Sequence, residues 1–461
     1  MPTDRTADAL VVFGITGDLG RRMTLPALYR LELAGALPCD VVGMSRQERT
    51  TEELRTMARE AIVAAEGTID QTVFERFARR LTYLPGDATD PAAYERLTEQ
   101  LGDVRRPVFY LATPPSLFAP IVDSLGKAGL ADRARVVIEK PFGYDLKSAR
   151  QLNEQLLRVI DEQQIYRIDH FLGKEPVQDI VYLRFANEIL EPVWNRHHVE
   201  AVQITLAESF GIEGRGSFYD DVGALRDVVQ NHLLQVLALV SMEPPAGSTD
   251  AVADRRLDVL RAIPDADPTD YVRGQYEGYL EEPGVRPDSQ TETYAALRLR
   301  IANWRWAGIP FLIRAGKALR TSLSEVHVLF RRPPPILMGG HAAEVRHHNH
   351  VTLKIGRDAG ASMGVLVKEA RGDGVEPVHL DVSFREHLAK SPGPYERLLG
   401  EALEGDPTLF PRQDVIEELW RIVQPLLDAP PDAEPYARGS WGPAAADRLA
   451  EPFGGWRSPR E

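Results

Sequence analysis

Residues 9–20 read ALVVFGITGDLG, a continuous apolar run followed by a turn that contains three glycines. An apolar run of this length is typical of a strand buried in a parallel sheet. Leucines at positions 25, 28 and 31 then predict a helix directly after the turn. Such a turn can hold a pyrophosphate, because glycines let the backbone approach and a helix start offers free N–H groups. The candidate residues are Gly14, Thr16, Gly17, Asp18 and Leu19; because GxxGxxG is not the usual GxGxxG fingerprint, an ordinary β-to-α turn is the alternative.

The alternation of strand and helix continues as far as residue 168. Apolar runs at 41–44, 81–84, 108–112, 135–138 and 165–166 predict further strands, with helical patterns between them. Regular β/α alternation predicts a parallel sheet wound with helices, so we expect a Rossmann-type domain over residues 1–168. Ligands of such sheets bind at the carboxyl ends of the strands, which is where Arg46, residues 113–115 and Lys140 lie.

Arg46 comes directly after the second predicted strand. NAD enzymes place an acidic residue there to bind the ribose 2′-hydroxyl, whereas a guanidinium pairs bidentately with a 2′-phosphate. A solvated surface arginine is the alternative. We therefore expect NADP to be the cofactor.

After Lys174 the sequence pattern changes. Strand-like runs with polar residues at alternate positions occur at 202–208, 294–301, 326–330, 350–355 and 380–384. Runs with one apolar face predict a large antiparallel sheet with helices on one side. We therefore expect a second domain, of α+β class, over residues 169–461.

Two stretches outside the glycine turn combine charged and aromatic residues. Residues 167–174 read RIDHFLGK, and residues 223–235 read GALRDVVQNHLLQ. The apolar residues of the second stretch trace one face of an amphipathic helix. On an α-helix Asp227 and His232 lie about 140° apart, so we expect them to line two walls of one cleft and not to lie in register. A histidine that caps a core carbonyl group is the alternative.

Composition restricts the partners and the compartment. The formal charge of −14 argues against binding to nucleic acid or to an anionic membrane. The single cysteine, Cys39, favours a reducing cytosol, and no apolar run approaches the roughly 20 residues of a membrane span. Residues 1–8 are polar, with no signal-peptide core behind them. We expect a cytoplasmic protein.

A histidine cluster, His341, His347, His348 and His350, invites a metal interpretation. No cysteine or carboxylate completes a tetrahedral set around it, and the surrounding sequence is typical of a loop. We predict no metal site.

Seven motifs resemble those of the glucose-6-phosphate dehydrogenase family, and the resemblance covers nearly the whole chain. They are EKPFG at 139–143, RIDHFLGK at 167–174, EGRG at 213–216, RDVVQNH at 226–232, RAGK at 314–317, YERLL at 395–399 and GSWGP at 439–443. The EKP motif also occurs in glucose–fructose oxidoreductase-like sugar dehydrogenases, from which the RIDH stretch distinguishes this chain. The resemblance implies NADP-dependent oxidation of β-D-glucose 6-phosphate at C1 to the 1,5-lactone, the first step of the oxidative pentose phosphate pathway. It also implies a homodimer or homotetramer formed through the large sheet.

The same resemblance implies roles for single residues. His232 is the base that takes the C1 hydroxyl proton as hydride leaves, and Asp169 orients it, as the carboxylate does in a hydrolase triad. Lys140 reaches both the nicotinamide and the substrate, and could precede a cis proline, Pro141. The implied catalytic residues are His232, Asp169 and Lys140. The implied substrate-binding residues are Lys140, His170, Lys174, Glu208, Asp227 and Lys317.

Three positions depart from the family pattern. Phe171 replaces a tyrosine, Met23 replaces a lysine, and Ser322 stands where a basic residue is usual. Each change weakens phosphate binding, so two alternatives stay open: a dehydrogenase of the same fold for a different or unphosphorylated sugar, and a catalytically silent NADPH-binding sensor or scaffold. Mammalian members hold a second, structural NADP, whose basic residues are poorly matched here, so we expect none.

Overall fold

The computed structural model describes residues 5–247, 250–333, 349–356, 358–371, 375–389 and 391–457. The chain forms two compact units. The first comprises Met1–Lys174 and Pro392–Glu417, and the second comprises Glu175–Ser391 and Glu418–Glu461. The predicted boundary at 168/169 therefore needs correction, because the first unit continues to Lys174 and also contains residues 392–417, which we had assigned to the second domain.

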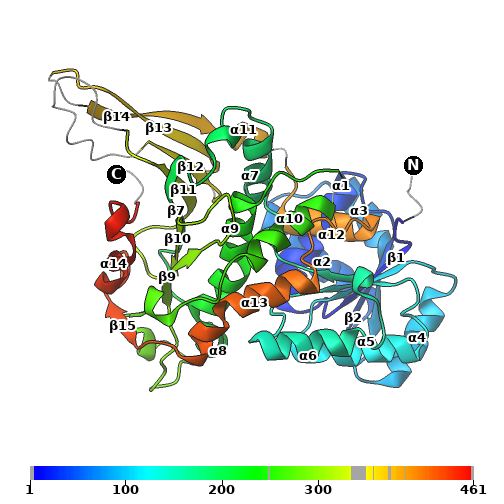
Figure 1. Ribbon diagram of the computed structural model, residues 1–461. Coiled ribbons are helices and arrows are strands. Elements are labelled where there is room, and N and C mark those ends of the chain that lie inside the picture. Colours follow the sequence, from blue (N-terminus) through cyan, green and yellow to red (C-terminus); the bar gives the residue numbers. More distant parts are fainter. Residues whose placement is uncertain are drawn as a thin grey trace. The chain divides into compact units, whose positions relative to one another are not determined.

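The first unit contains a six-stranded parallel sheet in the order β3-β2-β1-β4-β5-β6 (Figure 1). This order is that of a Rossmann fold, which confirms the predicted fold class. The strands are β1 (Ala9–Phe13), β2 (Asp40–Ser45), β3 (Leu81–Pro85), β4 (Pro107–Leu111), β5 (Arg135–Ile138) and β6 (Ile165–Arg167). Strand β1 is central, because Val12 pairs with Gly43 on one side and with Tyr110 on the other. The carboxyl ends of β1, β2 and β4 therefore lie side by side.

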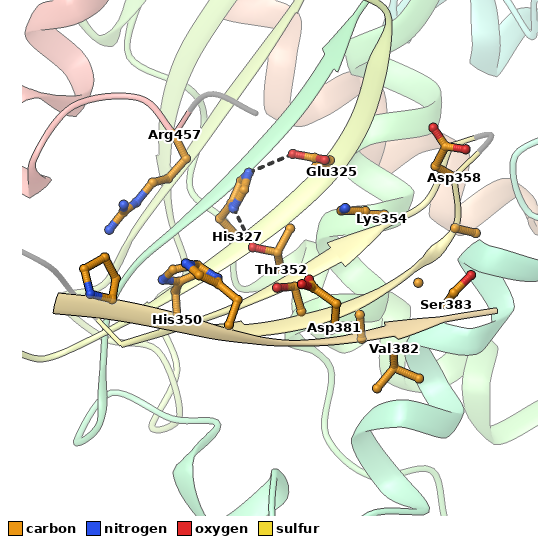
Figure 2. Close-up of a pocket in the computed structure, with 16 residues that line it drawn as sticks. Glu325, His327, His350, Thr352, Lys354, Asp358, Asp381, Val382, Ser383 and Arg457 are labelled. Carbon is orange, nitrogen blue, oxygen red and sulfur yellow. Dashed lines mark hydrogen bonds and ion pairs between the residues drawn. The ribbon is translucent and has the colours of Figure 1, made fainter. Parts of the chain in front are cut away.

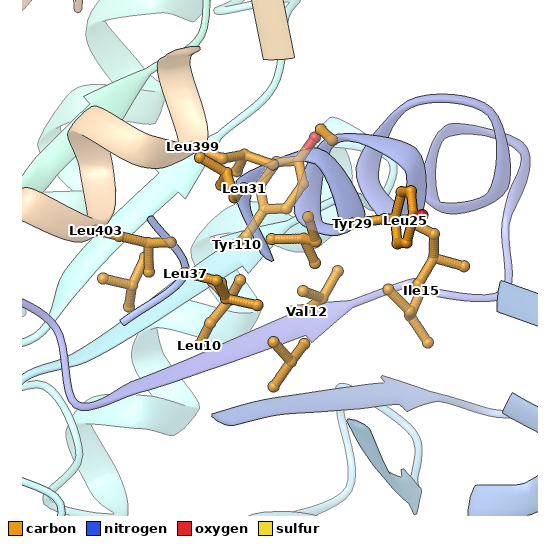
Figure 3. Packing of buried hydrophobic residues seen from close by; sticks show 14 of the residues in the cluster. Leu10, Val12, Ile15, Leu25, Tyr29, Leu31, Leu37, Tyr110, Leu399 and Leu403 are labelled. Carbon is orange, nitrogen blue, oxygen red and sulfur yellow. The ribbon is translucent and has the colours of Figure 1, made fainter. Parts of the chain in front are cut away.

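Helices that follow the strands complete this unit. They are α1 (Leu25–Leu33), α2 (Thr51–Glu66), α3 (Gln71–Arg80), α4 (Pro91–Leu101), α5 (Phe118–Lys127), α6 (Leu146–Leu156) and, from the distant segment, α12 (Pro394–Glu404). The orange helix α12 lies beside α1 (Figure 1). Figure 3 shows Leu399 of α12 near Leu31, and Leu399 and Leu403 belong to the same buried cluster as Leu10 and Val12. Because α12 contributes apolar surface to this core, the distant segment belongs to the first unit.

The second unit contains a nine-stranded sheet in the order β14-β13-β12-β11-β7-β10-β9-β8-β15. Neighbouring strands run antiparallel, except that β7 with β10 and β8 with β15 run parallel. The sheet is therefore mixed, although most of its pairs are antiparallel as predicted. Its strands are β7 (Val199–Ala207), β8 (Tyr271–Tyr276), β9 (Tyr294–Arg300), β10 (Pro310–Gly316), β11 (Leu323–Phe330), β12 (His350–Lys354), β13 (Gly360–Lys368), β14 (Val375–Ser383) and β15 (Ala433–Tyr436).

The helices of the second unit include one that is fully buried. They are α7 (Glu175–Phe185), α8 (Gly216–Ala224), α9 (Leu234–Ser241), α10 (Asp250–Arg261), α11 (Arg385–Leu388) and α14 (Asp447–Ala450), while α13 (Gln413–Asp428) belongs partly to each unit. Every residue of α9 is buried, and α9 contacts both α7 and α10. Among the described residues, no helix combines the length and apolar character that a bilayer crossing requires.

Candidate active site

A pocket of ≈ 540 Å³ lies at the carboxyl edge of the parallel sheet in the first unit. Its walls are the segments that follow four neighbouring strands, β1 to β4. Predicted cofactor residues that line it are Gly14, Thr16, Gly17 and Arg46. Asp18 and Leu19 do not line it, because they already belong to the helical turn that follows Gly17.

Gly14 shows why this turn needs glycine. Its φ is +80°, and a Cβ atom there would lie 2.3 Å from the carbonyl oxygen of Ala112, beyond the end of β4. Its own N–H group donates to the carbonyl of Met44 on β2, at 2.8 Å. No other residue would allow the three strand ends to approach so closely.

The wall around Arg46 is fixed by a chain of hydroxyl groups. Thr16 Oγ1 donates to Ser45 Oγ (3.0 Å), Ser45 Oγ is bonded to the Tyr83 hydroxyl (2.7 Å), and that hydroxyl donates to the Gln47 carbonyl (2.6 Å). The residues on both sides of Arg46 are therefore held, while its own side chain is exposed.

The residues present fit a nucleotide. Thr113 lines the pocket just after β4. Its Oγ1 atom is buried and has no hydrogen-bond partner among the described residues. A buried hydroxyl without a partner is costly, and a bound phosphate or ribose would supply one. Gly14, which admits a close approach, and exposed Arg46 complete a cradle suited to an anionic dinucleotide.

Lys140 follows β5, next to a buried carboxylate that sequence reasoning did not single out. The Lys140–Pro141 peptide bond is cis, as anticipated. The preceding Glu139 is 7% exposed and accepts hydrogen bonds from the hydroxyl groups of Tyr110 (2.6 Å) and Tyr395 (3.4 Å). Burial raises the pKa of Glu139 to about 7, against the opposing effect of these bonds. Tyr395 lies on α12, so the distant segment contributes to the support of Lys140.

The RIDHFLGK stretch begins at the last residue of β6, the edge strand of the parallel sheet. Asp169 is 4% exposed, and its Oδ1 atom accepts a hydrogen bond from the N–H group of Phe171 at 2.9 Å. The ammonium group of Lys174 lies 3.4 Å from the ring centroid of Phe171, and the ring of His170 meets the Phe171 ring at 5.2 Å. Phe171 lacks the family's hydroxyl, but its ring attracts the Lys174 cation.

In the second unit, Glu208 and Lys317 come directly after two parallel strands. Ala207 at the end of β7 pairs with Gly316 at the end of β10, so the next residues lie side by side. The Lys317 ammonium pairs with the Glu208 carboxylate, although the Lys317 residue is only 3% exposed. The Tyr219 ring lies 5.3 Å below the ammonium. The two predicted sugar-binding groups therefore form one ion pair, in which Lys317 is buried and Glu208 is partly exposed.

Residues 225–233 wind as a π-helix and not as the α-helix we predicted. In a π-helix hydrogen bonds join residues five apart, so such residues lie approximately one above the other. Asp227 and His232 are five apart, and our expectation that they do not lie in register is therefore wrong. His232 is 2% exposed. Wider turns of this kind occur frequently at functional sites.

Tyr219 is a residue of this site that the sequence did not reveal. Burial raises its pKa well above the usual value, and the nearby Asp227 carboxylate adds to the rise, as does that of Glu208. Tyr219 therefore keeps its hydroxyl proton, and its surroundings connect the Glu208–Lys317 pair with the π-helix.

The histidines considered for a metal site can be placed only in part. His341, His347 and His348 lie outside the described residues, while His350 is on β12 and contacts His379 with ring centroids 5.2 Å apart. Figure 2 shows this part of the sheet, with His327 bonded to Glu325 and Thr352. These residues line a pocket of ≈ 680 Å³ within the second unit.

The parallel sheet with its glycine-lined pocket, and a second unit with a carboxylate–ammonium pair and a buried imidazole, define a two-domain nucleotide-dependent dehydrogenase. Family models described as glucose-6-phosphate dehydrogenase, NAD binding domain and C-terminal domain, match residues 11–179 and 181–457. The chain therefore belongs to the glucose-6-phosphate dehydrogenase family.

Individual relatives agree with this assignment. Glucose-6-phosphate 1-dehydrogenase 1 of Mycobacterium tuberculosis (strain H37Rv) is 51% identical over 456 residues, which cover 98% of this chain and 97% of the relative. The crystal structure of glucose-6-phosphate 1-dehydrogenase from Mycobacterium avium matches with a TM-score of 0.93 and 51% identity, covering 99% of this chain and 100% of that one. A structure of glucose-6-phosphate dehydrogenase in complex with its substrate glucose-6-phosphate matches with a TM-score of 0.91 and 32% identity, covering 100% of both chains.

Proposed function

We propose that this chain oxidises β-D-glucose 6-phosphate at C1 to 6-phospho-D-glucono-1,5-lactone and reduces NADP. The observation that carries the proposal is the π-helix at residues 225–233, in a chain of this family. Residues five apart lie close to the same side of a π-helix, which supports pairing a carboxylate that can accept a sugar hydroxyl, Asp227, with a buried imidazole that can accept a proton, His232.

Each residue then has a chemical task. His232 takes the proton of the C1 hydroxyl while the electrons of the C1–H bond leave as hydride, and Asp169 stabilises the imidazolium that forms. Glu208 and Asp227 accept hydrogen bonds from sugar hydroxyls. Bound NADP supplies the hydride acceptor, and Lys140 and Lys317 donate hydrogen bonds to the substrate.

The sugar phosphate is assigned to His170 and Lys174. A phosphate dianion makes strong charge-assisted bonds to an ammonium and an imidazolium. The position of Lys174 over the Phe171 ring supports this role, because the ring restrains the ammonium without neutralising it.

The preference for NADP over NAD rests on Arg46. Its side chain lines the nucleotide pocket immediately after β2, where a 2′-phosphate would lie. The bonds that fix Ser45 and Gln47 hold the backbone on both sides of it.

A different sugar substrate is the second candidate, and one observation favours it. Ser322, where the family pattern has a basic residue, accepts a hydrogen bond from the N–H group of Ser209 at 2.9 Å, next to Glu208. The serine side chain offers a sugar phosphate no positive charge, unlike the basic residue of the family pattern.

The assembly and the compartment are further parts of the proposal. The outer strand β14 leaves Val378, Leu380 and Val382 exposed on one face, which favours a homodimer or homotetramer formed through the large sheet. The single buried thiol, Cys39, suits the cytoplasm. Light scattering of the purified protein would measure the assembly, and a strictly monomeric mass would exclude it.

One absorbance assay tests the activity. The rate of NADP reduction is followed at 340 nm in separate reactions that contain glucose 6-phosphate, glucose, another hexose phosphate or no sugar. We expect the highest kcat/KM with glucose 6-phosphate. A higher value with free glucose would support the second candidate, and no reduction with any sugar would support a silent nucleotide-binding protein.

A further inference from the structure

Glu292 connects the start of the π-helix with the nine-stranded sheet of the second unit. It lies just before β9, and the residue is 6% exposed. Its Oε1 atom accepts a hydrogen bond from the N–H group of Leu225 (3.0 Å), and its backbone carbonyl accepts one from the N–H group of Ala224 (2.9 Å). A single residue therefore satisfies two N–H groups at the start of the segment that carries Asp227 and His232.

These bonds replace a local cap. The first N–H groups of a helix have no partner within the helix, and the residue at the cap position, Ala224, has no side-chain oxygen to offer. A carboxylate at a helix start is also favoured by the helix dipole. The π-helix is thus anchored by a residue that is remote in the sequence.

The backbone is shaped to admit this carboxylate. Gly223 has φ +71°, and a Cβ atom on it would lie 2.5 Å from Glu292 Oε1. Any other residue would displace the carboxylate from Leu225 and would be strained itself. The hydrogen bond from Leu225 to Glu292 therefore depends on the glycine at position 223.

Glu292 is itself held from the other side. Arg273 on β8 donates to Glu292 Oε2 at 3.2 Å and to the Pro431 carbonyl at 2.7 Å. The neighbouring Thr293 carbonyl accepts a hydrogen bond from the N–H group of Lys317 at 2.9 Å. Two adjacent residues thus fix the π-helix and the backbone of Lys317.

We infer that Glu292 is a positioning residue, which fixes the first turn of residues 225–233 and thereby the orientation of His232 toward the sugar. The inference rests on the proposed function, because it assigns to Glu292 a task that has meaning only if His232 is the base. Glu292 acts through Leu225 and takes no part in the proton transfer itself.

A double-mutant cycle in the full-length chain tests this. Glu292→Leu should lower kcat by about 10–100-fold, because small displacements of a reacting group are costly, and KM for NADP should not change. Glu292→Gln keeps an oxygen for the Leu225 N–H group and should lose less than about tenfold. In a His232→Asn background, Glu292→Leu should cause little further loss, since the two residues act as one unit.

Equal losses from Glu292→Leu in both backgrounds would indicate a purely structural role and would overturn the inference, as would an unchanged kcat in Glu292→Leu. If Glu292→Leu does not fold, Gly223→Ala replaces it in the cycle, because it displaces the carboxylate without removing it. The matched control is Glu325→Gln, a change at a glutamate that is 8% exposed and bonded to His327, which should leave kcat unaltered.

Hydrogen exchange separates this inference from the proposed function. Faster exchange of the amides of residues 225–233 in Glu292→Leu would support the anchor even with no sugar present, and unaltered exchange would contradict it. A normal kcat in His232→Asn, by contrast, would contradict the base and hence the proposed function.

Discussion

The nucleotide pocket of the first unit and the buried polar groups of the second are built in different ways. The pocket is made of loops after parallel strands, with backbone groups and an exposed arginine, Arg46, along its walls. In the second unit His232 and Lys317 are 2% and 3% exposed, and the Lys317 ammonium pairs with the Glu208 carboxylate. The difference indicates that the nucleotide pocket binds its ligand by shape and charge. The reactive side chains of the second unit are instead held by contacts with other residues, because their chemistry tolerates little displacement.

The comparison predicts that turnover depends on the second unit. His232→Asn should lower kcat by about 10²–10⁴-fold, the range for loss of a general base, with NADP binding intact. Steady-state kinetics with a separate titration of NADP would measure both quantities. Near-normal turnover would mean that the buried imidazole is a structural group. It would contradict the conclusion that the second unit carries the chemistry.

Cofactor choice should depend on the first unit alone. Arg46→Ala should weaken NADP binding by about 1.5–3 kcal/mol, the value of hydrogen bonds between charged groups, and should leave NAD binding nearly unchanged. Competitive titration of both cofactors provides the measurement. If both lose affinity equally, Arg46 does not contact the 2′-phosphate.

Phe171, near the end of the first unit, tests whether this unit also binds the sugar phosphate. Phe171→Tyr restores the family's hydroxyl and should lower KM for glucose 6-phosphate by up to about tenfold, equivalent to one hydrogen bond near 1.4 kcal/mol. KM for free glucose should stay the same. A parallel change in both constants would show that this stretch does not bind the phosphate.

A change at Glu139, a buried side chain in the unit whose nucleotide pocket is lined by loops, should produce the smallest effect. Its folded-state pKa of about 7 lies above the ordinary value of 4.5, so the folded chain holds an extra proton between these pH values. Stability from this group is complete below pH 4.5 and decreases as pH rises to 7. Melting temperatures measured across this range should decline less in Glu139→Gln than in the unaltered protein. Identical slopes would show that Glu139 does not bind this proton.

The first unit was largely predictable, because its strands are short apolar-leaning runs that alternate regularly with helical patterns. All six strands of the parallel sheet lie where the sequence indicated them, within a few residues. In the second unit β13 escaped detection, since GASMGVLVK lacks a regular alternation of apolar and polar residues. Strand β10 was noted for its RAGK motif, but its strand character was overlooked.

The sequence did not reveal the local geometry that remote residues decide. The residue types around His232 could be recognised, but not the π-helical winding, which depends on the Gly223 kink and on Glu292. Tyr395 was recognised as part of a motif, but its bond to Glu139 requires the return of α12 to the first unit. Spacing along one element predicts such geometry only when that element is a regular α-helix or strand.

The return of residues 392–417 also has a consequence for synthesis. Domains commonly fold as they leave the ribosome, yet here the first domain lacks part of its core when residue 174 emerges. At roughly 5–20 residues per second, synthesis from residue 174 to the end of the returning segment takes roughly 10–50 s. During this time the apolar face of α1 is not covered by α12. A nascent chain stalled before residue 392 should therefore be cut by protease within residues 25–33 much faster than one stalled well beyond residue 417. During that interval the emerging enzyme is a natural client for chaperones.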